Sequence, residues 1–170
     1  MNLVESLIVI DKILTDLGVN HALIGGFALA AHGVHRATND IDFLVNEADR
    51  DILIANLPRF HWSLAAATEE VLHFVGDYAI DFILARRPLS QEMLREATQI
   101  PKLGVKAVSA EGLIGLKIQA YCNNPKRKLQ DKADILALMR TNPSVDLNRV
   151  KQYADLFDQW EEILLLRKDL

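Results

Sequence analysis

The chain has 170 residues, of which 50% are hydrophobic and 25% are charged, with a formal net charge of −4 and a single cysteine, Cys122. This composition is typical of a globular domain that can bury a core, and one cysteine excludes an internal disulfide, as expected for a reducing cytoplasm. The negative charge argues against a general nucleic-acid binder, which needs a broad positive field. No stretch reaches the length of a membrane helix and no signal peptide is visible, so we expect a cytoplasmic protein without a membrane partner.

The first elements along the chain are a helix and a strand. Residues 2–17 place leucine and isoleucine at spacings of three and four, which predicts an amphipathic helix that stops at Gly18. The short apolar run 21–24 then predicts a strand, and a short helix over about 27–32 follows it.

The second expected strand carries two aspartates, Asp40 and Asp42. Side chains alternate along a strand, so both carboxylates point to one face, close enough to reach shared metal ions. Two neighbouring anions repel each other unless a cation lies between them. A lone pair of this kind is most often two solvated aspartates on an edge strand.

The glycine pair Gly25-Gly26, upstream of the aspartates, favours the metal interpretation. A Gly-Gly turn lets the backbone approach a ligand closely, and the start of the next helix presents free N–H groups that suit phosphate. A phosphate cradle followed by a carboxylate pair is what a nucleoside triphosphate with magnesium requires.

A third carboxylate, Asp81, interrupts an otherwise apolar strand, where it needs a partner or a cation. An aspartate on the open face of a half-buried strand is the equally weighted alternative. The elements expected around it are a helix over 47–56, a strand or irregular link over 61–67, strands over 71–76 and 79–85 joined near Gly76-Asp77, a helix over 89–97 and a strand over 105–108.

The remainder of the chain is expected to be helical, over 110–122 and 127–139 and in two short helices with Ser144 and Asp158 as N-caps. Lys117 falls on the apolar face of the first of these helices. Two aspartates, Asp131 and Asp134, face inward from the second, which invites an ion pair. Two basic groups, Arg86-Arg87 and the cluster Lys126-Arg127-Lys128 with Lys132, are solvated charges or steer a phosphate-bearing substrate.

The glycine pair, a gap of thirteen residues and then Asp40-Ile41-Asp42 resemble the signature of the polymerase-beta-like nucleotidyltransferase superfamily. The stretch GGFALAAHGVHRATNDIDFLV is similar to the minimal nucleotidyltransferases, especially those akin to AbiEii-type toxins. It more distantly resembles antibiotic nucleotidyltransferases and the head domains of CCA-adding enzymes.

The resemblance implies an α+β fold, a small mixed β-sheet with helices packed on it. Residues 1–108 would form this nucleotidyltransferase-like core, and residues 109–170 a C-terminal helical region packed on the core. The resemblance also implies two Mg²⁺ ions as the cofactor and a nucleoside triphosphate as the substrate. The implied catalytic and metal-binding residues are Asp40, Asp42 and Asp81, and the implied nucleotide-binding residues are Gly25, Gly26, Arg36, Thr38 and Lys117.

The activity implied by the resemblance is transfer of a nucleoside monophosphate from the triphosphate to a hydroxyl acceptor. A toxin-like member would modify tRNA, another RNA or a protein, with an antitoxin protein and a homodimer among its partners. The alternatives are an antibiotic-modifying enzyme and a catalytically silent nucleotide-binding module of the same fold. A D-x-D-x-T phosphatase is excluded, because Leu44 stands where that motif has threonine.

Overall fold

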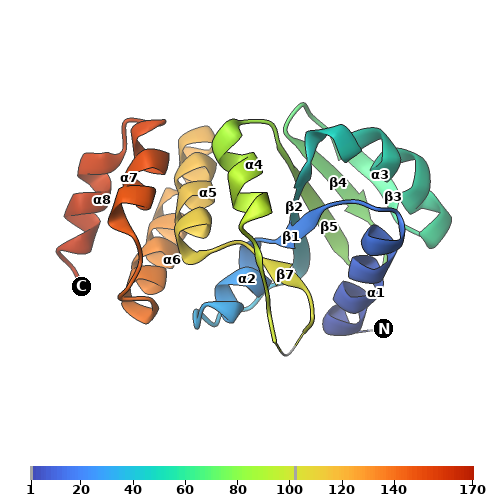
Figure 1. Cartoon of the computed structure of the whole chain (residues 1–170), viewed down its shortest axis with the longest axis horizontal. Helices are drawn as coiled ribbons and strands as arrows, with labels where there is room; N and C mark the ends of the chain where they lie inside the picture. Colours follow the sequence, from blue (N-terminus) through green and yellow to red (C-terminus); the bar gives the residue numbers. More distant parts are fainter. Residues whose placement is uncertain (1, 102) are drawn as a thin grey trace. The chain divides into compact units, whose positions relative to one another are not determined.

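The computed structural model describes residues 2–101 and 103–170, which divide into two compact units (Figure 1). The first unit contains the described residues up to Ala28 together with Arg36–Val108, and the second contains Leu29–His35 together with Ser109–Leu170. Residues 29–35, which lie inside the predicted core region, therefore group with the helical unit by their contacts.

The first unit is built on a mixed β-sheet. Across the described residues, seven strands pair in the order β3-β4-β5-β2-β1-β7-β6. Their bounds are β1 His21–Leu23, β2 Asp40–Asn46, β3 Ser63–Ala67, β4 Val71–Val75, β5 Ala79–Ala85, β6 Thr98–Gln99 and β7 Lys106–Ala107. The mixed sheet with its helices confirms the predicted α+β fold class.

The centre of the sheet is the parallel pair β2 and β5, flanked by antiparallel β1 and β4. On one face of the central strands β2, β4 and β5 the apolar side chains are buried, and three phenylalanines form the aromatic core of this face. Phe43 stacks on Phe82 with 5.9 Å between ring centroids, and Phe74 meets Phe82 edge-on at 5.7 Å. Burial of this face fixes the strand register, so the polar residues that alternate with the buried ones along each strand are held on the opposite face.

The helices of the first unit are α1 Leu3–Asp16, α3 Arg50–Asn56 and α4 Pro88–Arg95, with 3₁₀ turns η1 Glu47–Asp49 and η2 Leu57–Phe60. Helix α2, Gly25–Ala31, is divided between the two units. Helix α1 confirms the prediction from the leucine spacing, because Leu7, Ile10 and Leu14 are fully buried. Gly18 follows its end in the left-handed conformation, with φ of +71°, where glycine carries no steric penalty.

The second unit consists mainly of four helices, which lie side by side in Figure 1. Helix α5 contacts α6 and α7, and α8 contacts the same two helices. Their bounds are α5 Ala110–Asn123, α6 Lys128–Thr141, α7 Leu147–Asp155 and α8 Trp160–Arg167, with the 3₁₀ turn η3 Pro125–Arg127 before α6.

Two of the predicted helix N-caps are wrong. The cap of α7 is Asp146 rather than Ser144, and its carboxylate accepts hydrogen bonds from the backbone of Asn148 and Arg149. Helix α8 follows Gln159, while Asp158 has a positive φ of +54° and belongs to the turn before the helix. In both cases a capping-type side chain stands one or two residues before the position where the chain enters helical geometry.

Among the described residues, no helix is both long enough and apolar enough to cross a membrane.

Candidate functional site

Three carboxylates from two neighbouring strands converge on the half-buried face of the sheet. Asp40 and Asp42 alternate along β2 with the fully buried Ile41 and Phe43, so both aspartates point away from the phenylalanine core. Strand β5 runs parallel to β2 in a register that places Asp81 directly beside Asp42. The three residues each present a carboxylate oxygen within 4.8 Å of the other two. We call Asp40, Asp42 and Asp81 the carboxylate trio.

The glycine pair makes room for the carboxylates. A Cβ added to Gly25 would lie 1.8 Å from Oδ2 of Asp42, and Gly25 also has a positive φ of +61°. A Cβ added to Gly26 would lie 2.5 Å from Oγ1 of Thr38. Glycine is therefore required at both positions for these side chains to take their places, whatever part the pair plays toward phosphate.

Asp40 and Asp81 each have a polar neighbour that hydrogen-bonds the carboxylate. The hydroxyl of Thr38 donates a hydrogen bond of 2.9 Å to Oδ1 of Asp40. On the other side, Nδ1 of His73 hydrogen-bonds Oδ1 of Asp81 from the adjacent strand β4, where the two residues are direct cross-strand partners. The trio is thus held from both ends by polar side chains of the same unit.

The chemistry of this donor set fits a divalent cation. Carboxylate oxygens are the ligands that Mg²⁺ prefers, and three of them brought together repel one another until a cation neutralises them. The close approach of the Gly25 backbone to Asp42 keeps the site free of side-chain bulk on that side. Asp40, Asp42 and Asp81 are the residues that would hold the predicted Mg²⁺.

The remaining predicted nucleotide-binding residues lie in different settings. Arg36 is exposed, and its guanidinium donates a hydrogen bond of 3.2 Å to the carbonyl of Ala37. Lys117 belongs to the helical unit and is buried, with its Nζ 3.0 Å from Oδ1 of Asp131 and 2.7 Å from Oδ2 of Asp134. The sequence left two interpretations of Lys117, an ion pair with these aspartates or a contact with the triphosphate. The structure contains the ion pair.

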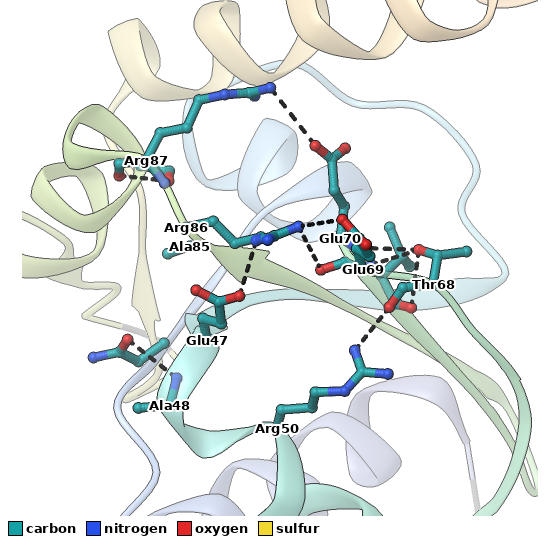
Figure 2. A network of polar contacts seen from close by, with 12 residues as sticks. Glu47, Ala48, Arg50, Thr68, Glu69, Glu70, Ala85, Arg86 and Arg87 are labelled. Atoms are coloured by element: carbon teal, nitrogen blue, oxygen red, sulfur yellow. Dashed lines mark hydrogen bonds and ion pairs between the residues drawn. The ribbon is translucent and has the colours of Figure 1, made fainter.

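The two basic groups, which the sequence left as either solvated charges or steering groups for a substrate, are paired with acidic side chains. Figure 2 shows Arg86 between Glu47 and Glu69, at 2.8 and 3.1 Å, and Arg87 reaching toward Glu70. Hydrogen bonding to Glu69 is the main reason that the pKa of Arg86 is raised above its ordinary value.

The same network contains Arg50, which donates a hydrogen bond of 2.7 Å to the backbone carbonyl of Thr68 (Figure 2). These contacts join the end of β2, the β3–β4 turn and the end of β5.

In the second basic group, Lys128 and Lys132 both pair with Glu162. Most of the positive charge of the two basic groups is therefore offset by neighbouring carboxylates. This weakens the interpretation that these groups steer a phosphate-bearing substrate.

A surface pocket in the helical unit has a volume of about 360 Å³. It contains none of the predicted site residues. Its lining residues are Met139, Arg140, Asn142, Pro143, Val145, Leu147, Arg167 and Leu170.

Sequence reasoning did not identify His73 or the hydrogen bond from Thr38 to Asp40. A signal for the first was present, because a tight turn centred on Asp77 places His73 and Asp81 at equal distances from the turn and hence opposite each other. The bond from Thr38 has no such signal, since residues 32–39 have no regular secondary structure that would predict a side-chain direction.

Comparison with known proteins gives matches at the level of structure. No family model matches the sequence, and no curated protein matches it. The solution structure of the antibiotic-resistance factor ANT(2'')-Ia is similar with a TM-score of 0.68 at 15% identity, over 99% of each chain. An antigenic nucleotidyltransferase-like protein from Paracoccidioides brasiliensis has a TM-score of 0.57 at 17% identity, over 98% of this chain and 92% of its own.

The lincosamide antibiotic adenylyltransferase LnuA, in its lincomycin-bound structure, also has a TM-score of 0.57, at 13% identity, over 79% of this chain and 94% of its own. These likenesses show that the chain has a nucleotidyltransferase-like fold, in agreement with the resemblance of its glycine and aspartate motif. None of the three is described as an AbiEii-type toxin, so that finer resemblance stays a prediction.

Proposed function

We propose that this chain is a metal-dependent nucleotidyltransferase, which moves a nucleoside monophosphate from a nucleoside triphosphate to a hydroxyl acceptor. The observation that carries the proposal is the convergence of Asp40, Asp42 and Asp81 within 4.8 Å of one another on one sheet face. The fold shared with nucleotidyltransferases supports the same chemistry. A structural pair of surface aspartates would not need a third carboxylate beside it.

The residues of the trio have distinct roles in this proposal. All three would hold two Mg²⁺ ions. When bound, these ions would neutralise the charge of the triphosphate and lower the pKa of the acceptor hydroxyl. The acceptor oxygen attacks the α-phosphorus, the bond from that phosphorus to the bridging oxygen breaks, and pyrophosphate leaves with the electron pair. Asp81 is the proposed acceptor of the hydroxyl proton.

Nucleotide binding is proposed for Gly25, Gly26, Arg36 and Thr38. The exposed guanidinium of Arg36 can neutralise a phosphate, and the two glycines bring backbone close to the trio. Lys117 has the least support among the predicted nucleotide-binding residues, because its ammonium is already bound by two buried aspartates.

For the acceptor, we propose a small molecule that carries a hydroxyl group. The chain shares its fold with ANT(2'')-Ia and with LnuA, which has been solved bound to lincomycin. The crystal structure of ANT(2'')-Ia in complex with adenylyl-2''-tobramycin is similar to this chain with a TM-score of 0.65 at 18% identity. Transfer to an RNA or a protein, with an antitoxin partner and a homodimeric state, is the second candidate and rests on the resemblance of the motif to AbiEii-type toxins.

The test incubates the protein with each α-labelled nucleoside triphosphate and Mg²⁺, in separate reactions with aminoglycosides and lincosamides, with total RNA, or with a protein extract. Label on a small molecule supports our proposal, and label in RNA or protein supports the second candidate. The matched control is Asp42→Asn, which keeps the shape of the side chain and removes its charge. Mg²⁺-dependent nucleotide binding without transfer to any acceptor indicates a silent binding module instead.

A further inference from the structure

A row of polar residues crosses three neighbouring strands beside the trio. His73 on β4 is the direct partner of Asp81 on β5, and Asp81 is the direct partner of Asp42 on β2. Directly opposed residues of adjacent strands lie on the same face of a sheet. His73, Asp81 and Asp42 therefore form one continuous row, with the histidine at its outer end.

The direction of the hydrogen bond in this row is set by the chemistry of its partners. The contact joins Nδ1 of His73 to Oδ1 of Asp81. An ionised carboxylate can only accept, so Nδ1 carries the hydrogen and donates it. This assignment holds whether or not the second ring nitrogen is also protonated.

The hydrogen bond restricts the Asp81 side chain. Both side chains are partly exposed, 38% for His73 and 32% for Asp81, so neither is fixed by close packing. Without a partner, the Asp81 carboxylate would be free to rotate away from the repulsion of the two aspartates beside it. Donation from His73 fixes one oxygen of Asp81 and leaves the other lone pairs of the carboxylate free to accept a cation.

We propose that His73 is a positioning residue for the metal site: its Nδ1–H orients the Asp81 carboxylate so that the trio is assembled before the cation binds. The inference rests on the proposed function, since it assumes that the trio holds a divalent cation. Removing the hydrogen-bond partner of a metal ligand typically lowers the metal affinity by 10- to 100-fold. His73 acts through Asp81 and is not itself placed among the ligands.

The test measures Mn²⁺ affinity by electron paramagnetic resonance, with Mn²⁺ as the probe for Mg²⁺, in wild type and two variants. His73→Leu removes the donor. His73→Asn places an amide N–H close to where Nδ1 stands, because that nitrogen is bonded to Cγ in both side chains. We expect His73→Leu to weaken Mn²⁺ binding about tenfold or more, and His73→Asn to remain within about threefold of wild type.

A matched control and the melting temperature separate positioning from stability. His35→Leu makes the same chemical change at an exposed histidine and should leave Mn²⁺ affinity unchanged. If His73 only stabilises the sheet, the melting temperature falls in His73→Leu while the Mn²⁺ affinity of the folded protein does not. That result overturns the inference, and so does a His73→Asn variant that binds as weakly as His73→Leu.

The outcomes also distinguish this inference from the proposed function. Wild-type protein that binds Mn²⁺ with an affinity unaffected by His73→Leu contradicts the role of His73 and leaves the metal site standing. Wild-type protein that does not bind Mn²⁺ contradicts both. If His73→Leu does not fold, His73→Asn decides: affinity near that of wild type supports the inference, and a tenfold loss overturns it.

Discussion

Gly25 lies directly against the carboxylate of Asp42. A Cβ added at residue 25 would overlap this carboxylate, because it would lie only 1.8 Å from Oδ2 of Asp42. This relationship links the glycine pair to the aspartate pair through packing. The two halves of the sequence motif are therefore physically dependent on each other, even before any ligand is considered.

The first prediction concerns Gly25→Ala. The variant should lose about 1–2 kcal/mol of unfolding free energy through its left-handed backbone, and should also lose about tenfold or more in Mn²⁺ affinity because Asp42 must move. The matched control is Gly18→Ala, at a φ of +71° with no atom within 4 Å of the added Cβ. It should show the loss of stability alone. Equal Mn²⁺ affinity in the two variants would contradict the packing argument.

The second prediction concerns Thr38, whose hydroxyl donates to Asp40. Thr38→Val keeps the shape of the side chain against Gly26 but removes the donor, so Mn²⁺ affinity should fall by about tenfold. Thr38→Ser keeps the hydroxyl and should bind nearly as wild type does. Titration of Mn²⁺ by electron paramagnetic resonance gives both values, and an unchanged affinity in Thr38→Val would show that Asp40 is held by other means.

The alternation of polar and buried residues in β2 could be predicted from the sequence because it depends on the strand period alone. Asp40 and Asp42 point to one face and Phe43 to the other, as expected. The proximity of Asp81 was predicted less directly, since the parallel register that sets it beside Asp42 depends on tertiary packing between segments about forty residues apart. The structure brings the three carboxylates together, and their role as metal ligands stays a prediction.

Strand β3 and the ion pair of Lys117 mark two limits of sequence-based prediction. All five residues of Ser63–Ala67 are exposed, so the strand has none of the alternating burial that identifies a half-buried strand. The spacing of Lys117, Asp131 and Asp134 indicated inward charges and left two interpretations open. The structure contains the ion pair, and a contact of Lys117 with a triphosphate stays a prediction.

The third prediction tests whether Lys117 is structural. In Lys117→Met, Asp131 keeps a hydrogen bond from Arg127 and Asp134 keeps one from Gln130, but the buried ammonium that pairs with both carboxylates is lost. Breaking a buried ion pair by removing one member typically costs about 3–5 kcal/mol, so urea unfolding should show a loss of about 3 kcal/mol.

Two comparisons sharpen this test. Replacing both aspartates by asparagine in the Lys117→Met background should recover part of the loss, because no unpaired charge is then left buried. Lys12→Met breaks an exposed pair with Asp16 and should cost at most about 0.5 kcal/mol. Should Lys117→Met retain full stability and yet raise the KM for nucleotide, the triphosphate contact would be the better interpretation.

The fourth prediction uses the pH dependence of the contact between α8 and α6. The hydrogen bond from Lys132 lowers the pKa of Glu162 below its ordinary value of 4.5. A lowered pKa in the folded state means that the contribution to stability is complete above about pH 4.5 and is lost as the pH falls through the folded-state pKa.

Glu162→Gln should therefore be less stable than wild type near neutral pH, by at most about 1 kcal/mol for a pair that solvent still reaches. The difference should disappear in acid below the lowered pKa. Glu161→Gln, at the neighbouring exposed position, serves as the control and should track wild type throughout. Unfolding curves collected between pH 3 and 7 measure both, and a difference that grows toward low pH would contradict the sign of this argument.

The most direct test of the account is the Mn²⁺ affinity of wild type compared with Asp40→Asn, Asp42→Asn and Asp81→Asn, with Asp16→Asn as an exposed control outside the trio. Each trio variant removes one charged ligand with little change of shape, so we expect each to weaken Mn²⁺ binding about tenfold or more while Asp16→Asn binds as wild type does. The same affinity in all five proteins would mean that the three carboxylates do not form a metal site.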